Sequence, residues 1–287
     1  MIHMPGLPFL ASKDGATIDF SLLLIHLLML AMLLAWGAVF VIILARFRRS
    51  RHPKAEYAGI KTRLAGWAEA GVVVAEAAML VGISIPFWAT RVNAVPGADQ
   101  QPVEVRVVAQ QYVWNVHYPG PDGKFGRTNA LLVDDKAGNP VGLDRNDPAA
   151  KDDVIAVNQL HLPVNRPVIV HLTSKDVIHS FALPELRVKR DAIPGMTVDV
   201  PFTPTVTTAQ FRNELKAEAT RSYSEKPGGL ADQLAAIDKR DYEIACAQMC
   251  GLAHYRMRGT LVVQTQDEFQ KWLKEQSLRS SVVEETW

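Results

Sequence analysis

The chain is poor in cysteine, with only Cys246 and Cys250 among its 287 residues. No Cys-x-x-Cys-His sequence occurs, which excludes a haem attached covalently to this chain. Internal repeats and low-complexity tracts are also missing, and the net charge is only +1. We expect no nucleic-acid partner for such a chain. Because 48% of the residues are hydrophobic while the mean hydropathy is close to zero, the average combines an apolar part and a polar part.

The N-terminal region lacks the features of a removable leader. Residues 1–17 contain one lysine and no basic region followed by a small-residue cleavage site. The apolar run that follows, residues 18–45, is therefore expected to be retained, and residues 64–90 form a second run. Each is longer than the roughly 20 residues that cross a bilayer. We predict two transmembrane helices, preceded by an outer segment over residues 1–17.

The loop between the two apolar runs, residues 46–63, determines their orientation. It carries seven lysine and arginine residues against one glutamate. Positively charged loops stay on the cytoplasmic side of a membrane. Both termini, and everything after the second span, are therefore expected on the outer side, which is the periplasm of a Gram-negative cell. The predicted location is the inner membrane, spanned twice.

Two carboxylates lie within the second apolar run. Glu69 and Glu76 are seven residues apart, so they share one face of a helix. Carboxylates inside a membrane are costly and usually face protein or a water path. Two interpretations stay open: a buried glutamate bonded to a polar neighbour, and a role in a proton path.

After a linker over residues 93–102, the hydrophobic pattern changes to a period of two. Val103, Val105 and Val107 are separated by polar residues, as in a half-buried strand. Short runs of this kind, with Gly- and Pro-rich turns between them, predict an all-β sandwich or barrel over residues 103–265. Further strands are expected at residues 112–118, 154–162, 167–173, 197–202, 209–213, 242–246 and 259–264.

Two parts of the chain depart from the strand pattern. The polar insert over residues 125–151 is rich in Asp, Asn and Gly, and we interpret it as a solvated surface excursion. A docking surface for a cationic partner is the alternative. The tail, residues 266–287, is expected to contain a short helix with Phe269, Trp272 and Leu273 on one face.

The two cysteines lie in a compact group of potential metal ligands. Within twelve residues, Cys246, Cys250, His254 and Met257 offer two thiolates, an imidazole and a thioether. Such soft ligands suit copper, and a second thiolate is enough to bridge two copper ions. A zinc site and a redox disulfide are the alternatives, but methionine is not a zinc ligand and a disulfide needs neither His nor Met nearby. We therefore predict a two-copper cluster that transfers single electrons.

A further ligand is expected from His179, because a blue-copper-type fold supplies one histidine from an earlier strand. The segment around His179, the segment 187–195 and the segment 246–257 together resemble subunit II of the haem–copper cytochrome c oxidases. The resemblance covers nearly the whole chain, since two apolar helices precede the domain here as well. It implies an α+β membrane protein, in which a two-helix transmembrane hairpin is followed by a cupredoxin-like domain with a dinuclear CuA centre.

The resemblance also implies a role for each metal ligand. Cys246 and Cys250 would bridge both coppers as thiolates. His179 and His254 would each bind one copper through a ring nitrogen. Met257 would be a weak ligand of one copper.

Two positions depart from the family pattern. Gln248, midway between the cysteines, would still offer its backbone carbonyl to the other copper. The family's commonest residue there is Glu, which helps to hold magnesium at the border with subunit I, and glutamine is a poorer ligand that puts this ion in doubt. The family's Trp-Tyr-Trp run is Tyr112-Val113-Trp114 here, so Tyr112 takes the place of the aromatic that receives electrons from cytochrome c. For Trp114, a plain core position is the alternative.

The resemblance implies that the chain works inside a complex. Electrons would pass to haem in subunit I, where oxygen is reduced to water with proton translocation. Subunit III and a cytochrome c, or a haem c domain of a neighbouring complex, would be further partners. The chain would then be a subunit of an oxidoreductase and translocase, without catalytic residues of its own.

Other classes of protein share parts of this pattern. A membrane-tethered copper-delivery factor for oxidase assembly also uses two nearby cysteines and a distant histidine. Such a factor has a thioredoxin-like pattern of alternating strands and helices, and it needs neither Met257 nor two spans. Quinol oxidases lack the copper ligands, and nitrous oxide reductase adds a large His-rich domain. The copper-delivery factor is kept as the alternative function.

Overall fold

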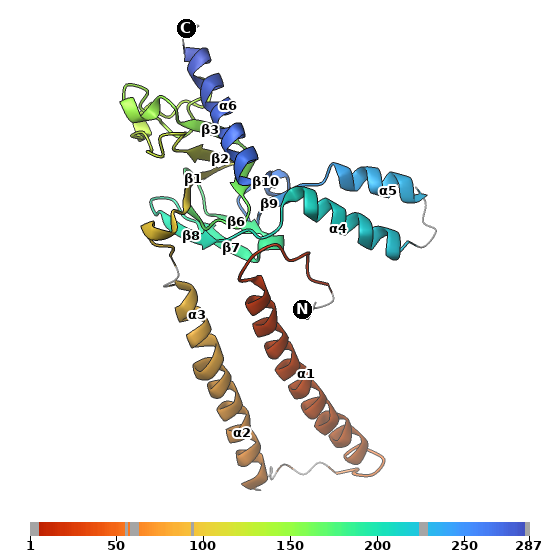
Figure 1. Ribbon diagram of the computed structural model, residues 1–287. Coiled ribbons are helices and arrows are strands. Elements are labelled where there is room, and N and C mark those ends of the chain that lie inside the picture. Colours follow the sequence, from red (N-terminus) through yellow and green to blue (C-terminus); the bar gives the residue numbers. More distant parts are fainter. Residues whose placement is uncertain (1–5, 55–56, 58–62, 93–94, 224–228, 285–287) are drawn as a thin grey trace. The chain divides into compact units, whose positions relative to one another are not determined.

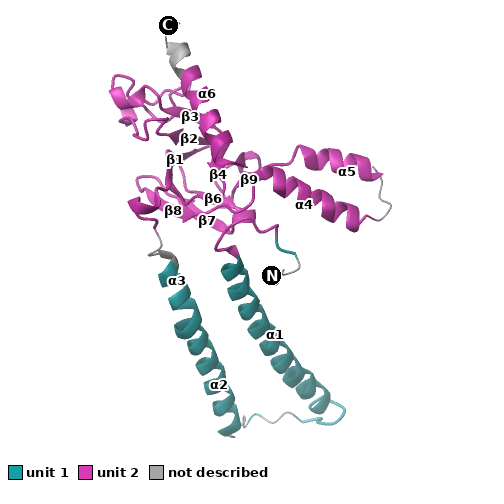
Figure 2. Ribbon diagram, in the orientation of Figure 1, with its two compact units in different colours: residues 1–7, 16–94 teal, residues 8–15, 95–287 magenta. Residues whose placement is uncertain are grey.

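The computed structural model describes residues 6–54, 57, 63–92, 95–223 and 229–284 (Figure 1). The chain divides into two compact units, which Figure 2 distinguishes by colour. Unit 1 consists of residues 1–7 and 16–94, and its described elements are helical. Unit 2 consists of residues 8–15 and 95–287 and contains the described strands.

Unit 1 contains the two apolar runs as helices. Helix α1 covers Gly15–Arg46 and α2 covers Arg63–Met79. A π-helical stretch, Leu80–Ser84, joins α2 to α3, Ile85–Val92. Both helical stretches are long and apolar enough to cross a membrane. Their apolar stretches are not buried within the described chain, so a lipid environment suits the exposed apolar side chains.

Unit 2 is a β-sandwich of two five-stranded sheets. Alternate residues of β1, Val105, Val107 and Ala109, are completely buried in the core between the sheets. The first sheet has the order β3-β2-β1-β5-β8 and the second has the order β4-β10-β9-β6-β7. The strands are β1 (Val103–Gln110), β2 (Val113–Tyr118), β3 (Val154–Val157), β4 (Gln159–Pro163), β5 (Val168–Ser174), β6 (His179–Leu183), β7 (Val188–Ala192), β8 (Val198–Phe202), β9 (Tyr242–Cys246) and β10 (Arg258–Gln264).

The single strand expected at residues 154–162 is divided between the two sheets. β3 pairs with β2, whereas β4 pairs with β10. Between them, Asn158 has a φ of +58°, a left-handed conformation that asparagine tolerates better than most residues. Its side-chain oxygen accepts the N–H of Trp114 at 2.8 Å, and its carbonyl accepts the N–H of Thr260 at 2.8 Å. Asn158 therefore carries the chain from one sheet to the other and bonds to both.

The prediction of a strand at residues 209–213 is wrong. Helix α4, Thr208–Arg221, occupies this segment, and α5, Gly229–Asp238, follows it. A reciprocal capping box between Thr207 and Gln210 begins α4 and satisfies two backbone donors. The capping box and the helix-forming residues that follow outweigh the short apolar alternation from which the strand was predicted.

Most of the insert over residues 125–151 is exposed, as expected of a solvated excursion, but part of it is packed. This insert contains two short 3-10 turns, Ala130–Leu132 and Pro148–Ala150. Three of its apolar residues are buried against two residues of the first sheet, which gives the insert a small core of its own. The cluster consists of Val141, Leu143, Ala150, Val108 and Ile155. Spacing of two or four residues does not reveal such a cluster, because the loop residues follow no regular period.

The C-terminal helix is longer than the short helix expected. Helix α6 covers Gln266–Glu284. The carboxylate of Glu268 accepts the N–H and the hydroxyl of Thr265, at 2.9 and 2.8 Å, at the start of the helix. Phe269 and Leu273 are buried, so the expected apolar face is the one that packs on the sandwich.

A segment that precedes α1, residues 8–15, is built into unit 2; we call it the strap. Ala11 is completely buried there. Its N–H donates to the carbonyl of Glu185 and its carbonyl accepts the N–H of Thr205, both at 2.8 Å. The strap therefore behaves as an additional edge of the sandwich rather than as a free outer segment.

Candidate metal centre

Two neighbouring strands of the second sheet position the first pair of predicted ligands. His179 is the first residue of β6, and Cys246 is the last residue of β9. The strands are antiparallel, with Phe181 opposite Cys246. Both ligands therefore lie at one end of the sheet.

The remaining predicted ligands lie in the cysteine loop, residues 247–257, which leads from β9 to β10. Its two ends are held close together. The Ala247 N–H donates to the Ser180 carbonyl at 2.9 Å, and the Cys246 N–H donates to the Met257 carbonyl at 3.3 Å. These bonds return the loop, with its predicted ligands, to the end of β9.

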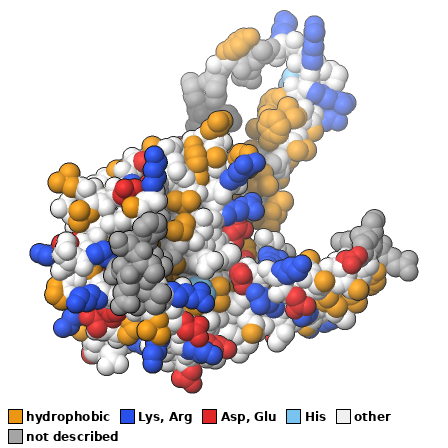
Figure 3. All heavy atoms as spheres, turned by 90° about the horizontal axis from the view of Figure 1, so that it is seen from above, with side chains coloured by type: hydrophobic (Ala, Val, Ile, Leu, Met, Phe, Trp, Pro, Cys, Tyr) orange, Lys and Arg blue, Asp and Glu red, His pale blue; other side chains and the backbone are white. Residues whose placement is uncertain are grey.

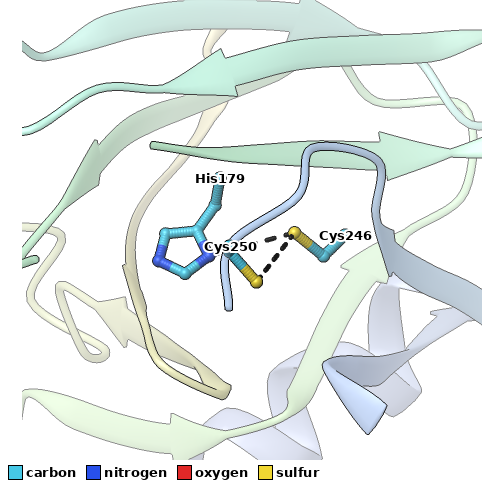
Figure 4. Close-up of side chains that lie close together, drawn as sticks. All are labelled: His179, Cys246 and Cys250. Atoms are coloured by element: carbon cyan, nitrogen blue, oxygen red, sulfur yellow. Dashed lines mark hydrogen bonds between the residues drawn. The ribbon is translucent and has the colours of Figure 1, made fainter. Parts of the chain in front are cut away.

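The predicted ligand side chains lie close together. The sulfur atoms of Cys246 and Cys250 are 3.8 Å apart, and Figure 4 shows them beside His179. The Nδ1 atom of His179 is 3.9 Å from the Cys246 sulfur, and that of His254 is 3.5 Å from the Cys250 sulfur. The Met257 sulfur is 3.7 Å from the Cys250 sulfur. Each thiol therefore has an imidazole of its own beside it.

Burial controls the protonation of one of the thiols. His179, Cys250 and Met257 are buried, whereas Cys246 and His254 are half-buried. Burial, together with the neighbouring Cys246 thiol, raises the pKa of Cys250 to about 11. Without a metal, Cys250 is therefore a protonated thiol at neutral pH. A metal that takes it as a thiolate must release a proton.

Asp176, which the sequence pattern did not single out, orients His179. Its Oδ1 atom is 2.9 Å from Nε2 of His179, which leaves Nδ1 facing the Cys246 sulfur. Burial alone would raise the pKa of Asp176, but hydrogen bonds from His179 and two backbone N–H groups hold it below its usual range. Histidine ligands are commonly oriented in this way through their second nitrogen. The one sequence cue is the three-residue spacing from His179.

Gln248 presents its backbone to the centre and its side chain to solvent. Its carbonyl oxygen lies 3.2 Å from the Cys246 sulfur. Its side-chain oxygen accepts the N–H of Met249, also at 3.2 Å, and the residue is exposed. A role for the carbonyl therefore does not depend on the identity of the side chain.

The two aromatic residues singled out in the sequence lie at different depths. Trp114 is completely buried and meets His179 edge-on, with ring centroids 6.2 Å apart. Tyr112 is half-buried in the turn between β1 and β2, and its hydroxyl lies against Gly251 of the cysteine loop. Tyr112 therefore connects the surface to the cysteine loop directly. Trp114 does not reach the surface and forms part of the core beside His179.

Glu69 and Glu76 do not belong to this centre. Both lie on α2, in unit 1, and both are exposed within the single chain. Their proposed role in a proton path stays a prediction.

The donor set fits copper better than the alternatives. Two sulfurs, two imidazole nitrogens and a thioether are soft or intermediate ligands, which copper accepts. A structural zinc site would use four Cys or His ligands and would leave Met257 without a function. The two cysteine sulfurs are 3.8 Å apart, and a disulfide between them would leave His179, His254 and Met257 without a function.

Comparisons with known proteins give consistent matches. The family model "Cytochrome C oxidase subunit II, periplasmic domain" matches residues 103–212. The alternative cytochrome c oxidase subunit 2 of Bradyrhizobium diazoefficiens is 31% identical over 232 residues, which are 80% of this chain and 70% of that protein. The cytochrome c oxidase subunit 2 of Thermostichus vulcanus is 32% identical over 124 residues, which are 43% of this chain and 28% of that protein. Among solved structures, the periplasmic domain of subunit II of the Bradyrhizobium japonicum cytochrome oxidase is 25% identical, with a TM-score of 0.38, and the match covers 64% of this chain and 98% of that domain.

Proposed function

The chain belongs to the cytochrome c oxidase subunit II family, and we propose that it carries a dinuclear copper centre through which single electrons enter a haem–copper oxidase. Members of this family are subunits of such oxidases, so the chain works within an oxidase complex. A copper-binding role is general to the family, and the two-copper form is the proposal made here. The strand-rich sandwich disfavours the alternative, because a copper-delivery factor would need a thioredoxin-like fold.

One observation carries the two-copper assignment: the paired thiols are each flanked by a separate imidazole. Cys246 has His179 beside it and Cys250 has His254, at 3.9 and 3.5 Å. A mononuclear blue-copper site would use one thiolate and two imidazoles around one metal, and it would leave the second thiolate unused. Two thiolates shared by two copper ions, with one imidazole for each ion, would use all four of these ligands.

The other residues of the centre have distinct proposed tasks. Met257 would be a weak ligand near Cys250, and the Gln248 carbonyl would be a weak ligand near Cys246. Asp176 would keep His179 in place through Nε2. When bound, copper supplies the one-electron redox change, and a rigid site favours rapid transfer because it changes geometry little. Magnesium is not part of the proposal, because the Gln248 side chain is neutral.

Two covalent connections support the proposed orientation in the membrane. The strap belongs to unit 2 and leads directly into α1, and the chain returns to unit 2 at residue 95 after α3. A chain that leaves a domain through one span and returns through a second has both outer ends on the same side. The basic loop over residues 46–63 then lies on the other side, which the positive-inside rule makes the cytoplasm.

The proposed electron donor is a cytochrome c or a haem c domain that docks near Tyr112. The neighbouring Gln111 is exposed, so the turn that holds both residues reaches the surface beside the copper ligands. On the face of unit 2 that Figure 3 shows, basic and acidic side chains are interspersed, so this face carries no field of a single sign. Subunit I would take the electron onward to haem and reduce oxygen to water with proton translocation, and subunit III would complete the complex.

Copper loading of the full-length chain in detergent tests the proposal. We expect two copper ions per chain, a purple colour, and an EPR spectrum of one unpaired electron shared by two nuclei. Cys250→Ser should remove this spectrum, because it removes one bridging thiolate. Met249→Leu, at an exposed position in the same loop, should leave it unchanged. One copper per chain, or a colourless product, would contradict the dinuclear assignment.

A further inference from the structure

The turn between β1 and β2 touches both segments that carry the predicted ligands. One segment, residues 176–179, holds His179 and is called the histidine segment here. The other is the cysteine loop. Gln111, in the turn, makes a hydrogen bond to each of them, one through its backbone and one through its side chain.

The backbone bond reaches the histidine segment. The Gln111 N–H donates to Oδ2 of Asp176 at 2.7 Å. The other oxygen of the same carboxylate lies 2.9 Å from Nε2 of His179. The turn is therefore linked to His179 through a single carboxylate.

The side-chain bond reaches the cysteine loop at a ligand residue. The amide Nε2 of Gln111 donates to the backbone carbonyl of Cys250 at 2.5 Å. This approach depends on Gly251, where an added Cβ would lie 2.7 Å from that nitrogen and 2.6 Å from the hydroxyl of Tyr112. Gly251 also has a φ of +132°, which residues with a side chain rarely adopt. The loop is thus shaped to receive the turn.

The supports of the cysteine loop differ along its length. The backbone bonds from Cys246 and Ala247 hold its ends, as described above. Between them, Met249 is 76% exposed and Leu252 is 95% exposed, so their side chains add little packing. Cys250 itself is buried in the core, and the His254 N–H donates to the Gly251 carbonyl at 3.1 Å. The Gln111 amide therefore adds a bond from the turn to the backbone of the residue that carries a predicted bridging thiolate.

We propose that Gln111 is a positioning residue that holds the Cys250 part of the cysteine loop against the histidine segment, so that the ligands are spaced for metal before it binds. The inference rests on the proposed copper centre. Replacing a residue that orients metal ligands without binding the metal itself commonly lowers metal affinity or activity by about 10–100-fold. Because the backbone N–H to Asp176 remains in any substitution except proline, the side-chain bond can be tested by itself.

Gln111→Met in the full-length chain, purified in detergent, is the first variant. Methionine keeps the length and flexibility of the side chain but cannot donate to the Cys250 carbonyl. Gln110→Met is the matched control, because Gln110 is the last residue of β1 and directly precedes Gln111. This variant loses the bonds of the Gln110 side chain to Asp135 and Lys175, neither of which is a predicted metal ligand. Gln111→Glu, which keeps the shape and replaces the amide donor by an acceptor, is the second variant if the first does not fold.

The measurements are copper affinity by chelator competition, the copper-to-protein ratio, the EPR spectrum and the unfolding temperature of the metal-free protein. For Gln111→Met and Gln111→Glu we expect copper affinity about 10–100-fold below wild type and an EPR pattern with less even sharing of the electron. The control should keep wild-type affinity and spectrum. If both Gln111 variants bind copper as the control does, the inference is overturned. If wild type itself does not bind two coppers, the proposed function fails first, and the two failures are thereby distinguished.

Discussion

At the scale of single residues, Glu185 has a buried carboxyl with one oxygen that lacks a partner among the described residues. It lies in the turn Pro184–Leu186 between β6 and β7 and is 6% exposed. Its Oε2 atom has no hydrogen-bond partner among the described residues. Burial raises the pKa of Glu185, and a hydrogen bond from its own backbone N–H, with the charge of nearby Arg240, opposes this shift only in part. The folded protein therefore favours the protonated carboxyl more than the unfolded chain does.

The pH dependence of stability should reveal this residue. A carboxyl whose folded pKa is raised contributes stability below its unfolded pKa, and this contribution is lost as the pH rises through the folded pKa. At pH 8 the buried Glu185 carboxyl therefore lowers the free energy of unfolding. We expect Glu185→Gln to stabilise the protein by about 1 kcal/mol, or about 2–4 °C in Tm. Near pH 4, about the unfolded pKa of a glutamate, the difference should disappear.

Thermal unfolding at several pH values provides the check. Glu214→Gln, at an exposed position on α4, is the control and should leave Tm nearly unchanged at every pH. A Glu185→Gln variant that is less stable than wild type by the same amount at pH 4 and pH 8 would show that the charge is not the cause.

At this scale the sequence revealed the residues whose chemistry is specific, and missed those that support them. Cys246, Cys250 and His254 are recognisable because soft ligands rarely gather at such spacing by chance. Asp176 and Gln111 carry common side chains, and their roles come from contacts between distant parts of the chain. Gln111 is 65 residues from Asp176 and 139 residues from Cys250, so no local period connects them.

At the scale of elements, the helix pair α4–α5 is the part of unit 2 that the strand pattern did not predict. It is inserted between β8 and β9, and the family match ends within α4, at residue 212. Phe211 anchors α4 to the sandwich, with its ring stacked on that of Tyr242 at 4.4 Å. The strands themselves were predictable because their alternation reflects burial on one face, whereas the helix pair depends on capping and on one buried aromatic.

Truncating the Phe211 side chain should lower the stability of the protein without changing its metal binding. Phe211 is completely buried, and Phe→Ala in a core typically costs about 3–5 kcal/mol through lost burial and the cavity left behind. We expect Phe211→Ala to lower the free energy of unfolding by that amount while the copper-loaded chain keeps its wild-type EPR spectrum. Chemical denaturation and EPR on the same preparation measure both quantities.

An exposed substitution on the same helix, Glu218→Ala, should change the free energy of unfolding by less than about 0.5 kcal/mol. A Phe211→Ala variant that remains as stable as this control would mean that α4 is not anchored by its aromatic residue.

At the scale of the whole molecule, the topology follows from how the chain alternates between its units. Unit 2 is entered twice, once by the strap and once after α3, while the basic loop belongs to unit 1. Composition alone indicated the two spans and the positive charge of the loop between them. It did not indicate that residues before the first span belong to the sandwich, because the strap has no strand-like alternation.

Site-directed labelling can test the orientation in intact spheroplasts. In a chain with Cys246→Ser and Cys250→Ser, we expect Lys124→Cys, an exposed position in unit 2, to react with a membrane-impermeant maleimide. Lys54→Cys, in the basic loop, should react only after the cells are lysed, because the proposed orientation places that loop in the cytoplasm. Labelling of Lys54→Cys in intact spheroplasts would reverse the proposed orientation.

The strap has a consequence for how the molecule is made. Ser12 donates to the carbonyl of Leu186 across 174 residues, so residues that precede the first span find their partners only after the segments that follow both spans have been synthesised. Membrane insertion and completion of the sandwich are therefore not independent steps of biogenesis. A soluble fragment that begins at residue 95 would lack Ala11 from its core. If the helices of unit 1 were separated from unit 2, the strap would remain attached to α1 and be lost from the sandwich.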